Sequence, residues 1–89
     1  MALTIYSTTW CGPCKRLKSQ LTREGIAYEE VDIERDPGAA EFVESVNQGN
    51  RTVPTVVVDS PNGRQVRTNP SVAEVRAMLA GTTAPQPLR

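Results

Sequence analysis

The chain alternates between short runs of strand-forming residues and longer segments in which apolar residues recur at helical spacing. Residues 3–7 form a first β-rich run, and a short loop follows at residues 8–10. From residue 11 to residue 24 the apolar positions fall on one helical face, at Cys14, Leu17 and Leu21. The pattern therefore predicts a strand that leads through a short loop directly into a helix.

The middle of the chain continues this alternation. Residues 26–33 predict a second strand, although the alternation of apolar and polar positions is imperfect. Asp36-Pro37 has the residue types of an N-cap and a first helical position, and the apolar stripe behind it extends a helix to Gln48. Residues 52–59 predict a buried strand that is entered through a proline.

The last part of the chain predicts a hairpin and a third helix. Ser60-Pro61-Asn62-Gly63 is a strong turn signal, and residues 65–67 form the returning edge strand. Two starts are open for the final helix, one at Asn69-Pro70 and one at the capping box Ser71-x-x-Glu74. Gly81 is expected to end that helix.

The element order β-α-β-α-β-β-α predicts one α/β domain over residues 1–81, with a four-stranded mixed sheet flanked by three helices. The first two strands should be parallel and the last two antiparallel. Eighty-nine residues leave no room for a second core, and we expect residues 82–89 to form a disordered tail. In this fold Cys11 lies between the end of a strand and the start of a helix, where reactive groups of open α/β sheets gather.

Charge is balanced overall but divided along the chain. Ten basic and ten acidic residues cancel, yet residues 24–44 hold eight acids and a single base, whereas bases follow the cysteines at Lys15, Arg16, Lys18 and Arg23. Two interpretations stay open: these are solvated outer faces, or the bases form a patch that favours a thiolate and attracts anionic partners. Nothing suggests the net basic face with stacking aromatics that nucleic-acid binding needs.

Neither a signal-type apolar run nor a span near 18 apolar residues is present in the sequence. We expect a soluble cytoplasmic protein with no membrane contact. In that compartment a lone Cys-x-x-Cys is typical of redox or metal chemistry rather than of a structural disulfide.

Cys11-Gly12-Pro13-Cys14 contains both cysteines of the chain and follows its single tryptophan, Trp10. Thiolates are the attacking species in disulfide exchange. At a helix N-terminus, unpaired N–H groups and the helix dipole favour the Cys11 thiolate, by about 0.3–2 kcal/mol for the dipole. Lys15 and Arg16 add to this effect if they point inward. We therefore assign Cys11 as the nucleophile and Cys14, one turn deeper, as the resolving thiol.

The two cysteines also allow interpretations other than redox chemistry. A structural zinc site needs four ligands, whereas the chain has two cysteines and no histidine, so we expect no bound metal unless two chains pair. Two inert buried cysteines are a further alternative. Trp10 is expected to form an exposed lip beside Cys11, with a role in packing alone as its alternative.

Val53-Pro54 and the segment Thr68-Asn69-Pro70-Ser71 are two further candidates. The ordinary interpretation of Val53-Pro54 is a trans bond at a strand entrance. A cis bond would turn the Val53 N–H and C=O toward the cysteines, where they could pair with an extended substrate. The second segment is either a plain helix cap or a helix end whose free N–H groups hold a substrate carboxylate.

With these segments the chain resembles the thioredoxin-fold redoxins, and over residues 2–80 it is similar to the glutaredoxins, in particular to mycoredoxins of actinobacterial type. The matching blocks are residues 5–11 (IYSTTWC), 49–55 (GNRTVPT) and 68–71 (TNPS). The resemblance implies a thioredoxin-like, glutaredoxin-type fold. It also implies a thiol-disulfide oxidoreductase that reduces mixed disulfides between protein cysteines and a low-molecular-weight thiol.

The resemblance further implies roles for individual residues. By it, Pro54 is a cis-proline, and Thr52 and Val53 contact the cysteinyl part of the thiol. The rest of the thiol site consists of Arg51 and, at the distal end of the thiol, of Thr68, Asn69, Pro70 and Ser71. The residues that support the active site are Trp10, Gly12, Pro13, Lys15 and Pro54.

The resemblance also indicates the partners. The co-substrate is expected to be mycothiol, bacillithiol or glutathione, and no cofactor is expected to be bound tightly. Client proteins would be oxidised or S-thiolated, and the redoxin itself would be a monomer.

Two features of the chain depart from the patterns of these redoxins, one from glutaredoxins and one from thioredoxins. Glutaredoxins and mycoredoxins usually carry a Tyr between the cysteines, whereas Gly12-Pro13 is the thioredoxin pair, which makes a redoxin more reducing. Thioredoxins carry a buried Asp as proton relay six residues before the first cysteine, and Ile5 stands there in this chain. Without that base Cys14 should be hard to deprotonate, which favours a route through Cys11 alone.

Two alternative functions stay open. One is a thioredoxin-like dithiol reductase of protein disulfides that is recharged by a flavin disulfide reductase. The other is an iron–sulfur carrier, in which a dimer holds a [2Fe–2S] cluster on Cys11 of each chain and two external thiols. Pro13 is expected to tighten the turn against such a cluster.

Overall fold

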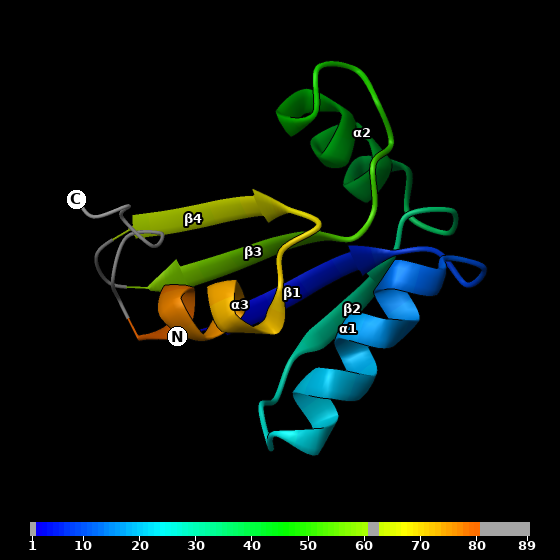
Figure 1. Ribbon diagram of the computed structural model, residues 1–89. Coiled ribbons are helices and arrows are strands. Elements are labelled where there is room, and N and C mark those ends of the chain that lie inside the picture. The colour runs from blue at the N-terminus through cyan, green and yellow to red at the C-terminus, as the bar shows by residue number, and fades with distance from the viewer. Residues whose placement is uncertain (1, 61–62, 81–89) are drawn as a thin grey trace.

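The computed structural model describes residues 2–60 and 63–80. Its elements are, in chain order, β1 (Ala2–Ser7), α1 (Gly12–Arg23), β2 (Glu29–Asp32), α2 (Pro37–Val46), β3 (Thr55–Ser60), β4 (Gly63–Thr68) and α3 (Val72–Leu79) (Figure 1). The predicted order of elements is confirmed. The predictions for Pro61, Asn62, Gly81 and the tail at residues 82–89 lie outside the described residues.

The sheet has the strand order β2-β1-β3-β4. β1 pairs in parallel with β2 and antiparallel with β3, and β3 and β4 form an antiparallel hairpin. The mixed sheet expected from the sequence is therefore confirmed. Because β1 and β3 run in opposite directions, the end of β1 lies beside the start of β3, with Tyr6 opposite Thr55. This pairing places the segment that follows β1 next to the segment that precedes β3.

The helices cover both faces of the sheet. On one face α1 and α3 pack over β1 and β3, and the buried residues of this core are Leu3, Ile5, Leu17, Leu21, Val56, Val58, Val75 and Met78. On the other face α2 supplies the buried residues Ala39, Ala40 and Val43, against which Tyr6 and Val31 pack. In Figure 1 α1 and α3 accordingly lie together and α2 lies apart from them.

Side-chain caps define the starts of α2 and α3. Asp36 caps α2, with its Oδ1 accepting the Ala39 N–H at 3.1 Å, and Pro37 is the first helical residue, as predicted. Ser71 caps α3 through a capping box with Glu74, which decides between the two predicted starts. Asn69 has φ 51, in the left-handed region, and therefore lies outside the helix.

Several predicted boundaries were wrong by a few residues. β2 begins at Glu29 rather than residue 26, because the Ile26 N–H bonds to the Leu21 carbonyl at 2.9 Å and completes the end of α1. α2 ends at Val46 rather than Gln48, since Gln48 has a left-handed φ of 58. β3 begins at Thr55 instead of residue 52, and β4 is longer than residues 65–67. None of the helices within the described ranges is long and apolar enough to cross a bilayer.

Candidate active site

Cys11 lies where β1 has ended and α1 begins. It is the N-cap of α1, and its Sγ accepts the backbone N–H of Cys14 at 3.3 Å. The Cys11 thiol also donates to the Val53 carbonyl at 3.7 Å. The sulfur thus has the helix N-terminal donor that the sequence predicts, and an N–H at that position stabilises negative charge on the acceptor.

Cys14 lies one turn deeper and is fully buried. Burial raises the pKa of the Cys14 thiol to about 12, and its hydrogen bond with Cys11 acts in the same direction. The backbone of Thr8 and the charge of Lys18 lower the pKa of Cys14, but they do not offset burial. Ile5 is buried in the adjacent core and offers no base. At neutral pH Cys14 is therefore a thiol, as expected in the absence of a proton relay.

The peptide bond Val53–Pro54 is cis. The sequence left both a trans and a cis bond open here, with trans as the ordinary form. The resemblance to glutaredoxins implied the cis bond, which is confirmed. Pro54 is fully buried, whereas Thr52 is exposed and Val53 is half-buried. The Val53 carbonyl reaches the Cys11 sulfur, so the segment 52–54 lines one side of the candidate site.

The segment 68–71 lies beside the cis-proline, because the Asn69 N–H donates to the Pro54 carbonyl at 2.7 Å. Its helix end is not open, however. The Ser71 N–H donates to Glu74 Oε1 at 2.9 Å, and the Glu74 N–H donates to Ser71 Oγ at 3.1 Å. The hypothesis that free N–H groups here hold a carboxylate is therefore wrong for Ser71 and Glu74. The plain cap is the interpretation that the structure supports.

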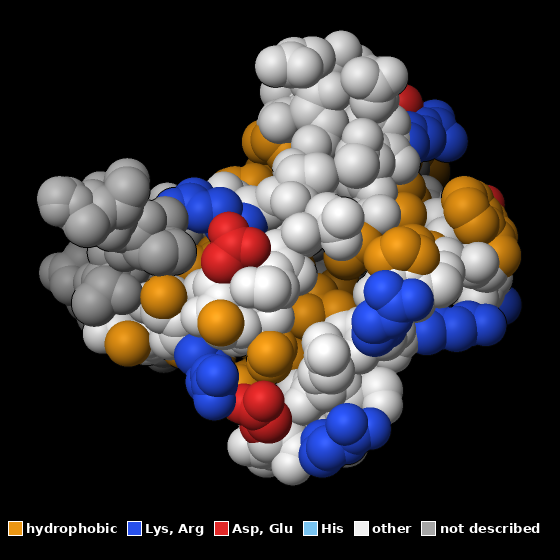
Figure 2. Space-filling model, viewed as in Figure 1, with side chains coloured by type: hydrophobic (Ala, Val, Ile, Leu, Met, Phe, Trp, Pro, Cys, Tyr) orange, Lys and Arg blue, Asp and Glu red, His pale blue; other side chains and the backbone are white. Residues whose placement is uncertain are grey.

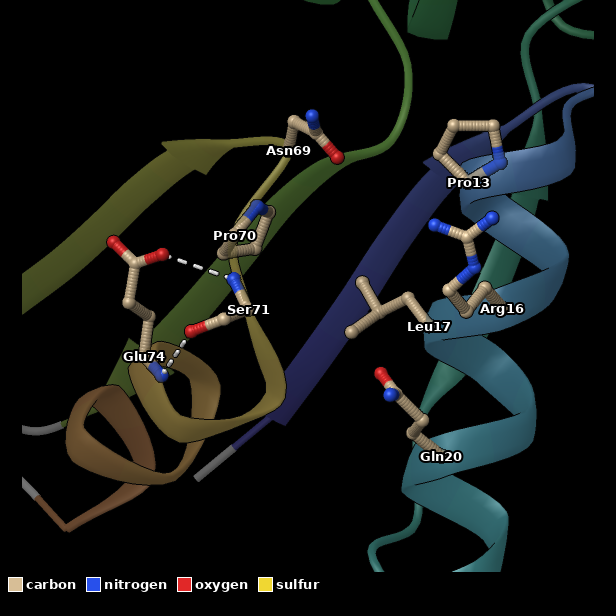
Figure 3. A pocket seen from close by; sticks show the side chains of 8 residues that line it. All are labelled: Pro13, Arg16, Leu17, Gln20, Asn69, Pro70, Ser71 and Glu74. Atoms are coloured by element: carbon tan, nitrogen blue, oxygen red, sulfur yellow. Dashed lines mark hydrogen bonds between the residues drawn. The ribbon is translucent and has the colours of Figure 1, made fainter.

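A pocket of about 300 Å³ lies between α1 and the start of α3. In Figure 3 Arg16, Leu17 and Gln20 project from α1 toward the segment 69–71. Figure 2 shows basic side chains gathered over the surface that α1 forms, beside this hollow. The sequence placed Asn69, Pro70 and Ser71 in the site but did not indicate Arg16, Gln20 or Glu74 as its lining. The pocket forms because the core packs α1 near α3, and no short sequence pattern shows which side chains of the two helices face each other.

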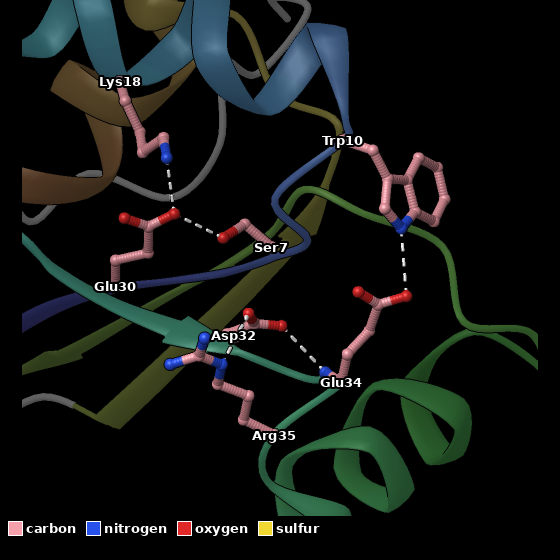
Figure 4. A network of polar contacts seen from close by, with 7 residues as sticks. All are labelled: Ser7, Trp10, Lys18, Glu30, Asp32, Glu34 and Arg35. Carbon is pink, nitrogen blue, oxygen red and sulfur yellow. Dashed lines mark hydrogen bonds and ion pairs between the residues drawn. The ribbon is translucent and has the colours of Figure 1, made fainter.

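The residues expected to support the active site lie at its entrance. Gly12 and Pro13 form the exposed first turn of α1, and the Lys15 side chain is exposed. Trp10 is 68% exposed, which agrees with an open lip beside Cys11. Its indole Nε1 donates to Glu34 Oε2 at 2.9 Å (Figure 4), a contact that the sequence did not predict.

Two basic residues of this region, Lys18 and Arg51, pair with acidic side chains. The Lys18 ammonium bonds to the Glu30 carboxylate, which also accepts from Ser7 Oγ at 2.6 Å (Figure 4). The Lys18 contact and then the Ser7 hydroxyl hold the pKa of Glu30 below its ordinary value. Arg51, expected in the thiol site, pairs with Glu44 at 2.6 Å while 62% of its side chain stays exposed. Within residues 2–60 and 63–80, no three His, Cys, Asp or Glu side chains gather to hold a metal ion.

The glutaredoxin family model matches residues 3–61. A Mycobacterium tuberculosis protein described as a glutaredoxin is 60% identical over 78 residues, which are 88% of this chain and 89% of that protein. The chain belongs to the glutaredoxin family. Mycoredoxin 1 of Corynebacterium glutamicum is 44% identical over 77 residues, 86% of this chain and 91% of that protein.

Solved structures agree on the fold. The glutaredoxin-like NrdH-redoxin of Escherichia coli superposes with a TM-score of 0.64 at 28% identity, over 76% of this chain and 82% of that one. The fold is thioredoxin-like and α/β, and the protein is a glutaredoxin-type thiol oxidoreductase with the pair Cys11 and Cys14.

The raised pKa of Cys14 predicts its behaviour in alkaline solution. In the reduced protein we expect the Cβ chemical shift of Cys14 to keep its thiol value up to about pH 10, because a pKa of about 12 leaves only about 1% of the thiol ionised there. The unfolded thiol ionises near 9.0. The free energy of unfolding should therefore fall as pH rises from about 9 to about 12, and Cys14→Ala should lack this part of the fall. A Cys14 shift that titrates near neutral pH would contradict the prediction.

Proposed function

We propose that this glutaredoxin reduces mixed disulfides between protein cysteines and a low-molecular-weight thiol, with Cys11 as the nucleophile. The observation that carries the proposal is the environment of the two sulfurs. Cys11 Sγ accepts an N–H at the helix start and lies against the cis-proline segment, whereas the pKa of Cys14 is raised by burial. One sulfur is placed to react and the other is held as a thiol.

The reaction is a sequence of disulfide exchanges. The Cys11 thiolate attacks the sulfur of the small thiol, forms a new disulfide with it and releases the client cysteine as a thiolate, which takes up a proton. A second molecule of the small thiol, as its thiolate, attacks the small thiol's sulfur in that disulfide. The products are the oxidised small thiol and the Cys11 thiolate. Alternatively Cys14 loses its proton and attacks Cys11 Sγ, which expels the small thiol and forms the intramolecular disulfide.

The cis-proline segment provides the place for the cysteinyl part of the small thiol. The backbone of Val53 lies next to Cys11 Sγ, and an extended ligand can pair with its polar groups as an added strand does. Thr52 and Arg51 are exposed beside it. The segment 68–71 and the pocket behind it then receive the distal part of the same thiol.

The lining of that pocket favours a neutral, hydroxyl-rich distal group. The Glu74 carboxylate already accepts the Ser71 N–H that an anionic ligand would use at this helix end. Arg16 balances the charge of Glu74 within the lining, and the other polar side chains there are Gln20, Asn69 and Ser71. Mycothiol, whose distal part is an uncharged pseudodisaccharide, suits this pocket better than glutathione or bacillithiol, which end in carboxylates.

The proposed activity also implies a compartment, a binding surface for client proteins and an oligomeric state. A lone Cys-x-x-Cys pair suits redox chemistry in the reducing cytoplasm, where we propose that the protein acts. Trp10 offers an exposed aromatic surface next to Cys11 for S-thiolated client proteins. The proposed reaction needs no second copy of the chain, and we propose that the protein acts as a monomer.

A second candidate is supported by the residues between the cysteines. Gly12-Pro13 is the thioredoxin pair, and the similar NrdH-redoxin of Escherichia coli is described as having a thioredoxin-like activity profile. In this alternative both cysteines reduce protein disulfides, and a flavin disulfide reductase recharges them. The assay is the reduction of insulin disulfides. If NADPH with such a reductase drives it and a small thiol does not, the thioredoxin-like alternative is correct.

Replacement of each cysteine tests the proposed route. We expect Cys14→Ser to keep most of the activity on a peptide carrying a small-thiol mixed disulfide, because the second thiol molecule completes the cycle. Cys11→Ser should abolish that activity. The measurement is the rate of small-thiol release under excess mycothiol. Equally complete loss in both variants would refute the one-cysteine route.

Replacement of Glu74 tests the preference for a neutral thiol. Glu74→Gln keeps an oxygen that accepts the Ser71 N–H but removes the negative charge. We expect kcat/KM on a glutathione mixed disulfide to rise by about three- to tenfold, because a like charge near the distal carboxylate is gone. On a mycothiol mixed disulfide kcat/KM should stay unchanged.

Glu41→Gln is the matched control, since it removes one exposed carboxylate from α2, outside the pocket lining. It should change the rate on neither substrate. An equal change on both thiols in Glu74→Gln, or none on either, would show that the charge at this helix end does not select the thiol.

A further inference from the structure

Asn47 follows the last turn of α2 and touches three separate parts of the fold. Its side-chain amide donates to the Val43 carbonyl at 2.8 Å and to Thr55 Oγ1 at 3.1 Å. Its Oδ1 accepts the hydroxyl of Thr68 at 2.6 Å. Both N–H donors and the oxygen of this short side chain are therefore bonded, and the three partners belong to α2, β3 and β4.

Two of these partners lead directly to the segments that line the candidate thiol site. Thr55 Oγ1 donates in turn to the Thr52 carbonyl at 2.8 Å, which closes the turn around the cis-proline. Thr68 is the residue before Asn69, whose N–H donates to the Pro54 carbonyl. The segments 52–54 and 68–71 are thus joined by one backbone hydrogen bond and, through side chains, by Asn47.

The backbone around Asn47 also directs the chain into the site. The two residues that follow it have left-handed φ values, 58 for Gln48 and 90 for Gly49, so the chain reverses immediately after the helix. The Asn47 carbonyl then accepts both the backbone N–H of Asn50, at 3.1 Å, and its side-chain amide, at 3.2 Å. The loop that carries residues 51–54 therefore starts from the residue that also holds Thr68.

We propose that Asn47 is a positioning residue that fixes the segments 52–54 and 68–71 relative to each other, so that the small thiol meets one preformed surface. The inference rests on the proposed function, in which both segments hold that thiol. Ordering a loose segment on binding costs free energy, and a preformed site avoids this cost. The hydrogen bonds of the Cys11 sulfur go to Val53 and Cys14 rather than to Asn47, so the effect of Asn47 falls on substrate binding. A loss of uniform binding raises KM and leaves kcat unchanged.

The test compares Asn47→Ala and Thr68→Val with the control Ser45→Ala. Ser45 lies on the same helix end, and its hydroxyl donates only to the Phe42 carbonyl, at 2.6 Å. The first readout is hydrogen exchange of the Asn69 N–H, which reports the bond between the two segments directly. We expect exchange to accelerate about tenfold in the first two variants and to stay unchanged in the control.

The second readout is kinetic, on a peptide carrying a mycothiol mixed disulfide. We expect Asn47→Ala to raise KM by about tenfold with kcat unchanged, a size that the loss of two or three hydrogen bonds allows. The double variant with Thr68→Val should have the KM of Asn47→Ala alone, because the hydroxyl that Thr68→Val removes donates to Asn47 and acts on the site through that bond. A double variant whose KM rises by the product of the two single effects would overturn the proposal.

The outcomes separate this inference from the function on which it rests. A wild-type protein that does not turn over small-thiol mixed disulfides contradicts the proposed function, and the Asn69 exchange rate then decides the role of Asn47 by itself. If Asn47→Ala lowers the stability but leaves KM and the exchange rate of the Asn69 N–H at their wild-type values, Asn47 is an ordinary helix cap and the proposal is wrong. If Asn47→Ala does not fold, Thr68→Val decides, because it removes one bond of Asn47 and keeps the others.

Discussion

The antiparallel pairing of β1 with β3 is the constraint on which the site depends. It sets the end of β1 beside the start of β3, with Tyr6 opposite Thr55. Cys11 follows β1, and the cis-proline segment precedes β3. The Val53 carbonyl therefore lies next to the Cys11 sulfur. Residues 42 positions apart thereby form one site. A slip of this register by one residue would turn the side chains of one strand to the opposite face relative to the other, and Leu3 and Ile5 of β1 would then leave the core that α1 and α3 cover.

The two cysteines show how a thioredoxin-type sequence can serve glutaredoxin-type chemistry. The Gly12-Pro13 pair leaves Cys11 at the helix start with an N–H directed at its sulfur. Cys14 is fully buried, and burial raises its pKa, while Ile5 supplies no carboxylate at the position that thioredoxins use. Both sulfurs are buried, and they differ in that Cys11 accepts a backbone N–H at the helix start while burial raises the pKa of Cys14.

Much of the fold could be predicted because its signals are local. Asp36-Pro37 and the Cys-x-x-Cys turn act within a few residues and lie where the sequence put them, and the box Ser71-x-x-Glu74 is one of the two helix starts that the sequence left open. The exact span of β2 could not be predicted, since it depends on pairing with β1. The contacts of Asn47 with Thr68 and of Trp10 with Glu34 join residues 21 and 24 positions apart, for which no local pattern exists.

The central claim is that Cys11 carries a low-molecular-weight thiol as a catalytic intermediate. It is tested most directly by incubating the Cys14→Ser protein with a lysate of the cells that produce it and reading the adduct on Cys11 by mass spectrometry. In a lysate from which free small thiols have been removed, neither Cys14 nor a second thiol molecule can resolve the intermediate, so it accumulates. We expect one small-thiol adduct on Cys11, with the mass of mycothiol. Adducts of client proteins alone, with no small thiol on Cys11, would contradict it.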